Sequence, residues 1–567
     1  MQRLFFTSVL LFLIGCSPAE KPAVVAAPEV TQSAAVAMPD VYAAQVAEDI
    51  LRAGGNAVDA AVAAGFALAV TYPEAGNIGG GGFMLIHING KEVFLDYREK
   101  APLAADRDMY LDENGEVIEG ASLVGHLAVG VPGTVAGFWE AHQQYGSLPW
   151  RDLVMPAVKL ATDGFVVSDS LGGGMLTMSG WFGSKTNFNK YFGEMTAGKT
   201  FRQAELAATL QRIADSGPDD FYRGNTAELI VAEMQRGEGL ITMQDLDQYQ
   251  PVWREPLRAE WRGYEIVSAP PPSSGGFAVI QLLKMKDYLA QQFKDVPHNS
   301  PQYVHLVAEM EKRVFADRQQ YLGDPDFVDT RIDELIDPEY IAMRAQQVNP
   351  HAISTLDAAG PGLESPDTTH YSILDKWGNA VSNTYTLNIG FGSGVIVEGG
   401  GFLLNDEMDD FSVKPGVPNT YGVVGFEANE IQPGKRMLSS MSPTLLLKDG
   451  KVEMVVGTPG GTTIFTSVFQ AIANIVDFGM TPAQSVGATR FHHQLMPPDL
   501  ITFSPSRPLS DETISSLGDM GYRAVPHQWE FGDLQVIWRN GDELEPAADP
   551  RNRGDARVIT EPAAAPE

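Results

Sequence analysis

Hydrophobic residues near the N-terminus follow the spacing of amphipathic helices. The spacing holds from Val41 to Ala53 and is followed by Gly54 and Gly55, a typical helix-ending signal. Asn56 can cap a second helix, which an Ala-rich run extends to about Val70. The small side chains of this second run predict close packing against a neighbouring element.

Elsewhere, pairs of segments alternate between polar and apolar residues and predict β-hairpins. Each pair flanks a turn signal: Asn89 and Gly90, the cluster Asp375 to Asn379, or Asp449 and Gly450. The paired segments are Phe83–Ile88 with Glu92–Tyr97, Thr368–Leu374 with Ala380–Leu387, and Thr444–Leu447 with Val452–Val456.

The last of these strands leads through Pro459, Gly460 and Gly461 into a helical run from Thr462 to about Ile475. A helix start of this kind presents free backbone N–H groups at the positive end of the helix dipole. It can therefore hold an oxyanion. Between roughly Leu148 and Val348 the pattern predicts mostly amphipathic helices, with no repeat of solenoid period.

The first residues of the chain are predicted to be a targeting signal. Arg3 precedes an apolar run from Leu4 to Ile14 that is too short for a permanent membrane helix, which predicts an export signal over residues 1–15. Leu13 to Cys16 resembles the bacterial lipobox, which implies that Cys16 is lipidated; the alternative is a plain signal peptide with a chance cysteine. Ser17 after the cysteine is what the resemblance associates with the periplasmic side of the outer membrane. Residues 16–38 are predicted to be a flexible tether.

Composition and charge exclude several classes of function. The 567 residues are 44% hydrophobic and 20% charged, as in ordinary folded proteins. The formal net charge of −32 would repel a phosphate backbone and argues against nucleic-acid binding. A single cysteine rules out intrachain disulfides and cysteine-based metal centres. No motif calls for a metal or an organic cofactor.

Three familiar catalytic or binding motifs fail on inspection. The four glycines Gly79 to Gly82 lack the Lys-Ser/Thr of a phosphate-binding loop and lead into a strand. Ser274 and Ser393 lie near glycines but not in a nucleophile elbow. A metal-binding motif would need spaced histidines and carboxylates, but His492 and His493 are adjacent, and a strand would point them to opposite faces. We therefore expect both histidines to be packing residues.

Thr368, the first residue of a predicted strand, remains as a candidate nucleophile. A threonine hydroxyl needs a base. If the chain is cut before Thr368, the freed α-amine, with an ordinary pKa of about 8, can accept the proton. A threonine that starts a strand is otherwise most often structural.

The ordered motifs of the chain resemble the γ-glutamyltranspeptidase (glutathione hydrolase) family of N-terminal-nucleophile hydrolases. The resemblance runs from about Pro39 to Arg551. It implies an α/β (α+β) fold, a sandwich of four layers in the order αββα. It also implies self-cleavage between Asp367 and Thr368 into two associated subunits, residues 39–367 and residues 368–567. The motifs that carry it are GGNAVDAAVAAGFALAV, LDYREKAP, TTHYSILD, TYTLN, LLNDEMDDF, LSSMSPT and GTPGG, which begin at Gly54, Leu95, Thr368, Thr384, Leu403, Leu438 and Gly457.

The resemblance also assigns roles to individual residues. Arg98 would grip the substrate α-carboxylate, as a guanidinium can with two parallel hydrogen bonds, and Glu407 and Asp410 would meet the α-ammonium. Thr386 would support the nucleophile. The remaining assignments are Asn388, Ser439 and Ser440 for hydrogen bonds to the glutamyl head, Gly460 and Gly461 for the oxyanion, and Tyr421 with its partner Arg490 for a lid formed by the loop between Phe411 and Arg436.

The implied reaction transfers a γ-glutamyl group from amides such as glutathione, through a threonine ester, to water or to acceptor amino acids and dipeptides. Two other hypotheses remain. An acylase for glutaryl or cephalosporin side chains, or a γ-polyglutamate-processing enzyme, would share the fold, but a glutaryl group lacks the amine that Glu407 and Asp410 would meet. A non-catalytic solute-binding lipoprotein would not be cut, so a denaturing gel separates it from the enzyme.

Overall fold

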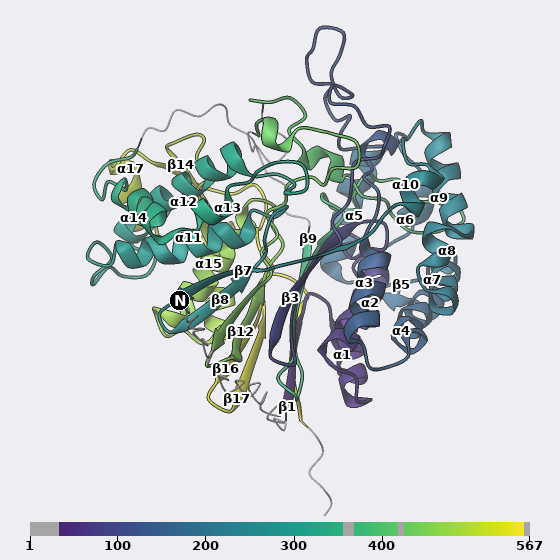
Figure 1. The fold of residues 1–567 in the computed structure, drawn as a ribbon, viewed down its shortest axis with the longest axis horizontal. Helices are drawn as coiled ribbons and strands as arrows, with labels where there is room; N and C mark the ends of the chain where they lie inside the picture. The colour runs from purple at the N-terminus through teal and green to yellow at the C-terminus, as the bar shows by residue number, and fades with distance from the viewer. Residues whose placement is uncertain (1–32, 355–367, 418–424, 561–567) are drawn as a thin grey trace, which may run out of the picture.

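The computed structural model describes residues 33–354, 368–417 and 425–560, and two antiparallel β-sheets lie face to face at its centre (Figure 1). The seven-stranded sheet has the order β18-β1-β9-β10-β2-β3-β6, and the six-stranded sheet has the order β17-β16-β12-β11-β8-β7. Their bounds are β1 Ser33–Met38, β2 Gly81–Ile88, β3 Lys91–Asp96, β6 Val252–Arg254, β9 Thr368–Leu374, β10 Ala380–Thr386 and β18 Asp555–Thr560, then β7 Leu257–Trp261, β8 Tyr264–Ser268, β11 Thr444–Lys448, β12 Lys451–Gly457, β16 Gln535–Asn540 and β17 Glu543–Ala548.

Helices cover the outer face of each sheet, which confirms the predicted αββα sandwich (Figure 1). On the seven-stranded sheet these are α1 Val41–Arg52, α2 Ala57–Thr71, α3 Thr134–Tyr145, α4 Trp150–Asp163, α5 Asp169–Phe182, α6 Phe188–Phe192, α7 Ala204–Ser216, α8 Asp219–Tyr222, α9 Asn225–Arg236 and α10 Met243–Asp247. On the six-stranded sheet they are α11 Gly275–Tyr288, α12 Pro301–Tyr321, α13 Ile332–Leu335, α14 Pro338–Gln346, α15 Thr463–Val476, α16 Pro482–Gly487 and α17 Asp511–Asp519.

Short elements complete the fold. They are the strands β4 Phe165–Val166 with β5 Thr200–Phe201, the small sheet of β13 Phe491–His492, β14 Leu500–Phe503 and β15 Arg523–Pro526, and the 3₁₀ helices η1 His126–Ala128, η2 Glu407–Asp410 and η3 Glu427–Asn429.

Helix α2 packs closely on β9 and β10, as its small residues predict. Asn56 and Asp59 form a capping box at its N-terminus. The hydroxyls of Tyr371 and Tyr385 each donate a 2.9 Å hydrogen bond to backbone carbonyls of the helix. A Cβ added at Gly65 would lie only 2.4 Å from the ring of Phe138, so the contact requires a residue without a side chain.

The three predicted hairpins are confirmed, with small changes at their ends. They are β2 with β3, β9 with β10, and β11 with β12. In β9 and β10 every residue is buried, because the six-stranded sheet covers one face and α2 covers the other. Thr368 at the start of β9 pairs with Thr386 at the end of β10.

One sequence prediction was wrong. The last part of the predicted tether, Ser33–Met38, is strand β1, which lies between β18 and β9 and is almost wholly buried. Because both faces of β1 are covered, its sequence shows no polar alternation that would mark a strand. The prediction of mostly helices between about Leu148 and Val348 is confirmed, since α4 to α14 fill most of this range and only the short strands β4 to β8 lie between them.

The segments before and after residue 367 share both sheets. The N-terminal segment supplies β1, β2, β3 and β6 to one sheet and β7 and β8 to the other, and the C-terminal segment supplies all remaining strands of both. Strands from the two segments are hydrogen-bonded neighbours in each sheet. Two pieces cut at this point would therefore remain one folded unit.

Within the described ranges, no helix combines the length and the apolar character needed to cross a bilayer. The predicted export signal and Cys16 lie outside these ranges.

Candidate active site

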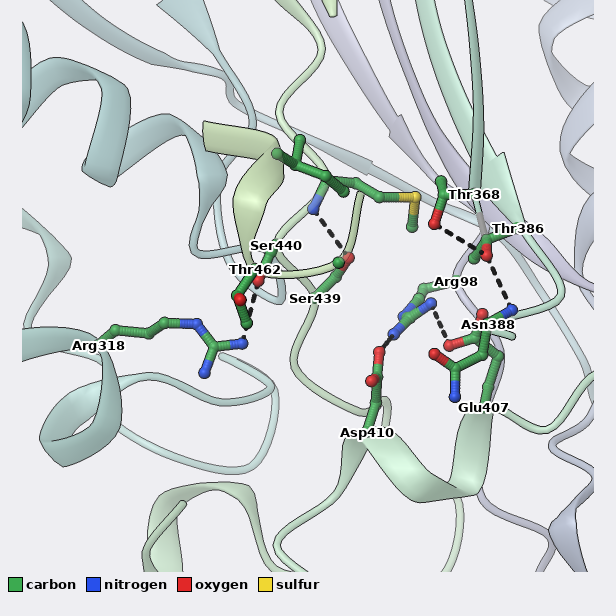
Figure 2. Close-up of a pocket in the computed structure, with 13 residues that line it drawn as sticks. Arg98, Arg318, Thr368, Thr386, Asn388, Glu407, Asp410, Ser439, Ser440 and Thr462 are labelled. Atoms are coloured by element: carbon green, nitrogen blue, oxygen red, sulfur yellow. Dashed lines mark hydrogen bonds and ion pairs between the residues drawn. The ribbon is translucent and has the colours of Figure 1, made fainter. Parts of the chain in front are cut away.

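A cavity at the ends of β9 and β10 gathers most of the predicted site residues (Figure 2). Four residues without a predicted role also line it: Arg318, Met441, Thr462 and Ile464. Nine predicted residues line it: Arg98, Thr368, Thr386, Asn388, Glu407, Asp410, Ser439, Ser440 and Gly461.

The hydroxyls of Thr368 and Thr386 lie side by side, with their oxygens 3.2 Å apart (Figure 2). The backbone N–H of Asn388 donates a 2.8 Å hydrogen bond to Thr386 Oγ1, which helps to fix that hydroxyl. Asn388 has a positive φ of 82°, a conformation that asparagine tolerates better than most residues. Its side-chain amide donates to the Asp406 carbonyl at 3.0 Å.

The glycines before β2 fix the end of β10. Asn77 Nδ2 donates a 2.8 Å hydrogen bond to the carbonyl of Thr386, and a Cβ at Gly80 would lie 2.0 Å from that same oxygen. A Cβ at any position from Gly79 to Gly82 would lie 2.0–2.5 Å from a backbone carbonyl oxygen, so these glycines serve close backbone packing, in agreement with the rejection of a phosphate-binding loop.

His370, two residues after Thr368, is not suited to act as its base. Burial lowers the pKa of His370 to about 3, so its ring is neutral. Its two ring nitrogens contact Thr384 Oγ1 at 2.8 Å and Ser372 Oγ at 3.1 Å. The ring is therefore engaged away from the Thr368 hydroxyl.

Arg98 lies two residues after β3 and is the centre of a buried charge cluster. Its guanidinium forms ion pairs with Glu407, at 2.6 Å, and with Asp410, and it lies 3.5 Å from Glu99. Glu407 and Asp410 are the first and last residues of η2. Because side chains three residues apart eclipse one another in a 3₁₀ helix, this element places both carboxyl groups on one side.

Burial controls the charges of this cluster. Desolvation is the largest cause that raises the pKa of Glu407, Asp410 and Glu99, and the nearby Arg98 opposes it. Three carboxyl groups thus share one guanidinium, of which those of Glu99 and Glu407 are fully buried and that of Asp410 is 16% exposed. A bound ammonium group would supply the second positive charge that these carboxylates lack.

Glu99 predicts a measurable pH dependence of stability. Its pKa is raised from 4.5 to about 8, so between these values the folded protein holds a proton that the unfolded chain has lost. This group therefore contributes stability at low pH that is lost as the pH rises from about 5 to about 8. We expect the melting temperature of Glu99→Gln to fall less than that of the wild type over this range.

Circular dichroism in matched buffers measures this difference, with the exposed Glu512→Gln as the control that should follow the wild type. Parallel curves for the wild type and Glu99→Gln would contradict the assignment.

Gly460 and Gly461 connect β12 to α15, as predicted. Both have positive φ, 134° and 55°, which favours glycine. Gly461 lines the cavity, whereas Gly460 does not. Neither backbone N–H donates to another described residue, so both are available to an oxygen atom of a ligand.

Ser439 and Ser440 lie on a turn that is fixed to the segment before α11. The backbone N–H of Ser439 donates to the Pro272 carbonyl, and the backbone N–H of Ser274 donates to the Ser439 carbonyl, both at 2.8 Å. The Ser439 hydroxyl accepts from the backbone N–H of Met441 at 3.1 Å. This turn is therefore held rigidly at the cavity wall.

Arg490 is held by contacts within the fold. It is buried, forms a 2.8 Å ion pair with Asp549 and donates to the carbonyls of Val486 and Phe531, and it does not line the cavity. Its expected partner Tyr421 lies outside the described residues, as does Asp367. The lid therefore stays a prediction.

His492 and His493 are packing residues, as expected. Burial lowers both pKa values to about 3, and the rings contact Thr466 and the Pro498 carbonyl. The described part of the chain contains no group of three or more His, Cys, Asp or Glu residues that could hold a metal ion.

Sequence reasoning missed Arg318, which reaches the cavity from the C-terminal part of α12. Within this helix, Glu309, Glu311, Lys312, Arg313 and Asp317 are also buried. One feature of the sequence could have pointed to Arg318. The helix of 21 residues has no clear polar face, so some of its charged residues must be buried and paired inside the protein.

Comparison with known proteins gives consistent sequence matches. The model of the gamma-glutamyltranspeptidase family matches residues 43–559. A glutathione hydrolase proenzyme of Pseudomonas aeruginosa is 58% identical over 525 residues, which covers 93% of this chain and 94% of the relative. A glutathione hydrolase proenzyme of Escherichia coli is 46% identical over 531 residues, which covers 92% and 90%.

Solved structures match as well. Gamma-glutamyltranspeptidase from Pseudomonas nitroreducens, complexed with L-DON, is 57% identical with a TM-score of 0.56, covering 56% of this chain and 95% of that chain. Cephalosporin acylase from Bacillus halodurans is 26% identical with a TM-score of 0.80, covering 97% and 99%. The fold is thus similar to that of enzymes with different substrates.

Proposed function

Because the chain belongs to the gamma-glutamyltranspeptidase family, we propose that Thr368 is the nucleophile with which it cleaves γ-glutamyl amides. The chain is an enzyme, a γ-glutamyltransferase and glutathione hydrolase, and it is made as a proenzyme that cleaves itself into two subunits. One observation supports the assignment of Thr368 most strongly. Thr368 lines the same cavity as the charged side chains of Arg98, Glu407 and Asp410.

Self-cleavage between Asp367 and Thr368 would give Thr368 a free α-amine next to its own hydroxyl. That amine is the base which the site otherwise lacks, because His370 is neutral and bonded elsewhere. The two products would stay together because strands from both are hydrogen-bonded neighbours in each sheet.

In the reaction, Thr368 Oγ1 attacks the γ-carbonyl carbon while the α-amine takes the hydroxyl proton. The C–N bond then breaks, and the same proton passes to the departing amine, which leaves a γ-glutamyl ester on Thr368. Water or the amine of an acceptor amino acid or peptide attacks this ester, and the threonine hydroxyl is restored.

Selectivity follows from the two ends of the glutamyl head. Arg98, Ser439 and Ser440 provide donors for the α-carboxylate, and Glu407 and Asp410 provide acceptors for the α-ammonium. Asn388 would add a further hydrogen bond to the glutamyl head. Because these groups come from rigid elements, a zwitterion bound between them holds its γ-carbonyl at a constant distance from Thr368.

The N–H groups of Gly460 and Gly461 would stabilise the tetrahedral oxyanion. Removal of one such donor costs about 3–4 kcal/mol in other hydrolases. The position of Gly461 at the cavity and the start of α15 two residues later support this role.

A release assay with a γ-glutamyl anilide, run with and without glycylglycine, tests the function. Stimulation by glycylglycine reports transfer, and release without it reports hydrolysis. A glutaryl anilide in the same assay tests the acylase alternative, since it lacks the α-ammonium group that Glu407 and Asp410 would bind. We expect cleavage of the first substrate at a rate far above that of the second, and the reverse order would refute the proposal.

Cys16 is proposed to carry a lipid that holds the enzyme at the periplasmic side of the bacterial outer membrane. The support is the Leu13-Ile14-Gly15-Cys16 string at the end of the apolar run. We expect cells that express the wild type to incorporate labelled palmitate into the protein, and Cys16→Ala to lose this label. Equal labelling of both proteins would exclude lipidation at Cys16.

A further inference from the structure

We propose that Arg318 is a further positioning residue of the γ-glutamyl site, which turns the hydroxyl of Ser440 toward the substrate α-carboxylate. The inference rests on the proposed function, because that function places the carboxylate beside Ser440. Arg318 lines the cavity and is only 7% exposed (Figure 2). Its NH2 group donates to Ser440 Oγ at 3.2 Å, and its Nε donates to Ser274 Oγ at 3.0 Å.

The directions of these hydrogen bonds determine where the hydroxyl hydrogens point. A guanidinium has donors only, so both serine oxygens must accept from Arg318. The Ser274 hydroxyl then donates its own hydrogen to the Ser439 carbonyl at 2.8 Å. The Ser440 hydroxyl has no second hydrogen-bond partner among the described residues, and Ser440 lines the cavity. Its hydrogen is therefore left for a ligand atom in the cavity.

A carboxylate is the ligand that this arrangement suits. The Ser440 hydroxyl arrives as a donor, its oxygen is polarised by a positive charge, and a carboxylate oxygen accepts without offering a competing hydrogen. Without Arg318 the hydroxyl could rotate, and its oxygen would offer a lone pair to the same carboxylate in some orientations. Arg318 thus selects one of the orientations available to the Ser440 hydroxyl.

The partners of Arg318 are held firmly enough for it to act in this way. Ser273 Oγ donates to the Met441 carbonyl at 2.6 Å, and Ser273 and Ser439 form a parallel β-bridge. Arg318 and the segment from Pro272 to Ser274 belong to the piece before residue 367, whereas Ser439 to Met441 belong to the piece after it. Arg318, in the segment before residue 367, therefore orients a substrate-binding hydroxyl that belongs to the segment after it.

The charge of Arg318 also acts on Asp410, which lines the same cavity. Its electrostatic attraction lowers the pKa of Asp410 against the larger effect of burial. This favours the ionised carboxylate that would meet the substrate ammonium. Arg318 ranks behind the paired Arg98 in this effect on Asp410, so its main action is through Ser440 on the α-carboxylate.

The test compares Arg318→Gln, Arg318→Lys, Ser440→Ala and the double variant Arg318→Gln/Ser440→Ala on two anilides. The γ-glutamyl anilide has the α-carboxylate, and 4-aminobutanoyl anilide lacks it but keeps the amine and the scissile amide. We expect Arg318→Gln to raise KM for the γ-glutamyl anilide about tenfold, the size of one hydrogen bond to a charged group, with kcat nearly unchanged. Arg318→Lys should lie between this variant and the wild type.

Two features separate positioning from a merely structural role. The double variant should be no worse than the poorer single variant within about twofold, because Arg318 acts through Ser440. On 4-aminobutanoyl anilide, Arg318→Gln should change kcat/KM much less than on the γ-glutamyl anilide. Arg151→Gln, the same change at a half-exposed arginine of α4 paired with Asp215, serves as the control and should leave both substrates unaffected.

Losses that add in the double variant, or equal losses on both substrates, would overturn the inference. If Arg318→Gln remains uncut on a denaturing gel, the comparison of Arg318→Lys with Arg318→Lys/Ser440→Ala decides by the same criteria. Failure of the proposed function looks different, since the wild type itself would then release no anilide.

Discussion

Thr368→Ala is expected to remain a single uncut chain and to lose γ-glutamyl release by about 10⁴- to 10⁶-fold, as when a catalytic nucleophile is removed from other hydrolases. The change removes the attacking hydroxyl, and by preventing cleavage it also withholds the α-amine that would serve as its base. A denaturing gel of the purified protein and an anilide release assay measure the two effects separately. Thr368→Ser, which keeps the hydroxyl, should be cut and retain activity.

Thr369→Ala is a matched control for this prediction. It removes a hydroxyl one residue away, on the opposite face of β9, and Thr369 Oγ1 is buried without a hydrogen-bond partner in the described part of the chain. This variant should therefore be cut and active. Cleavage of Thr368→Ala before position 368, or full activity of an uncut wild-type chain, would remove Thr368 from the mechanism.

Arg98→Lys is expected to lower kcat/KM for a γ-glutamyl anilide by about 10²- to 10³-fold, mainly through KM. Lysine keeps the positive charge that Glu407 and Asp410 need, but it replaces the planar guanidinium, which has several N–H donors, by a single ammonium group. It cannot pair with both carboxyl groups and also hold a substrate carboxylate by two parallel hydrogen bonds. Steady-state kinetics over a wide substrate range separates KM from kcat.

Arg98→Gln should be more harmful, because it leaves buried carboxyl groups without a cation. Loss of one partner from a buried ion pair costs about 3–5 kcal/mol, so the melting temperature should fall as well. Arg254→Lys is the control: Arg254 pairs with Asp96 at 2.7 Å in the same region but does not line the cavity. It should leave KM unchanged. A KM that stays constant in Arg98→Lys would contradict the carboxylate clamp.

Many local features were predictable from short stretches of sequence. The caps and length of α2, the hairpin turns at Asn89 and Asp449, and the strand that begins at Thr368 all depend on residues within a few positions of one another. The i to i+3 relation of Glu407 and Asp410 is equally local. These predictions held because turn chemistry and periodicity act through neighbouring backbone atoms.

The features that were not predicted involve residues whose environment comes from distant parts of the chain. Ser33–Met38 is a strand only because β18 and β9, more than 300 residues away, supply its partners. Arg490 was paired with Tyr421 by resemblance, and the structure adds carbonyl and carboxylate partners in the segment from Phe531 to Asp549. No local pattern records such pairings.

By itself, the sequence determined the class of chemistry, because its ordered motifs identify the family and its candidate nucleophile. It also determined the local elements, since these depend on the order of neighbouring residues. Only the tertiary structure decided which charges meet: three carboxyl groups around Arg98, and Arg318 on Ser440. The reason is physical, because burial makes charges and hydrogen-bond directions matter, and burial is a property of the packed layers and not of any single segment.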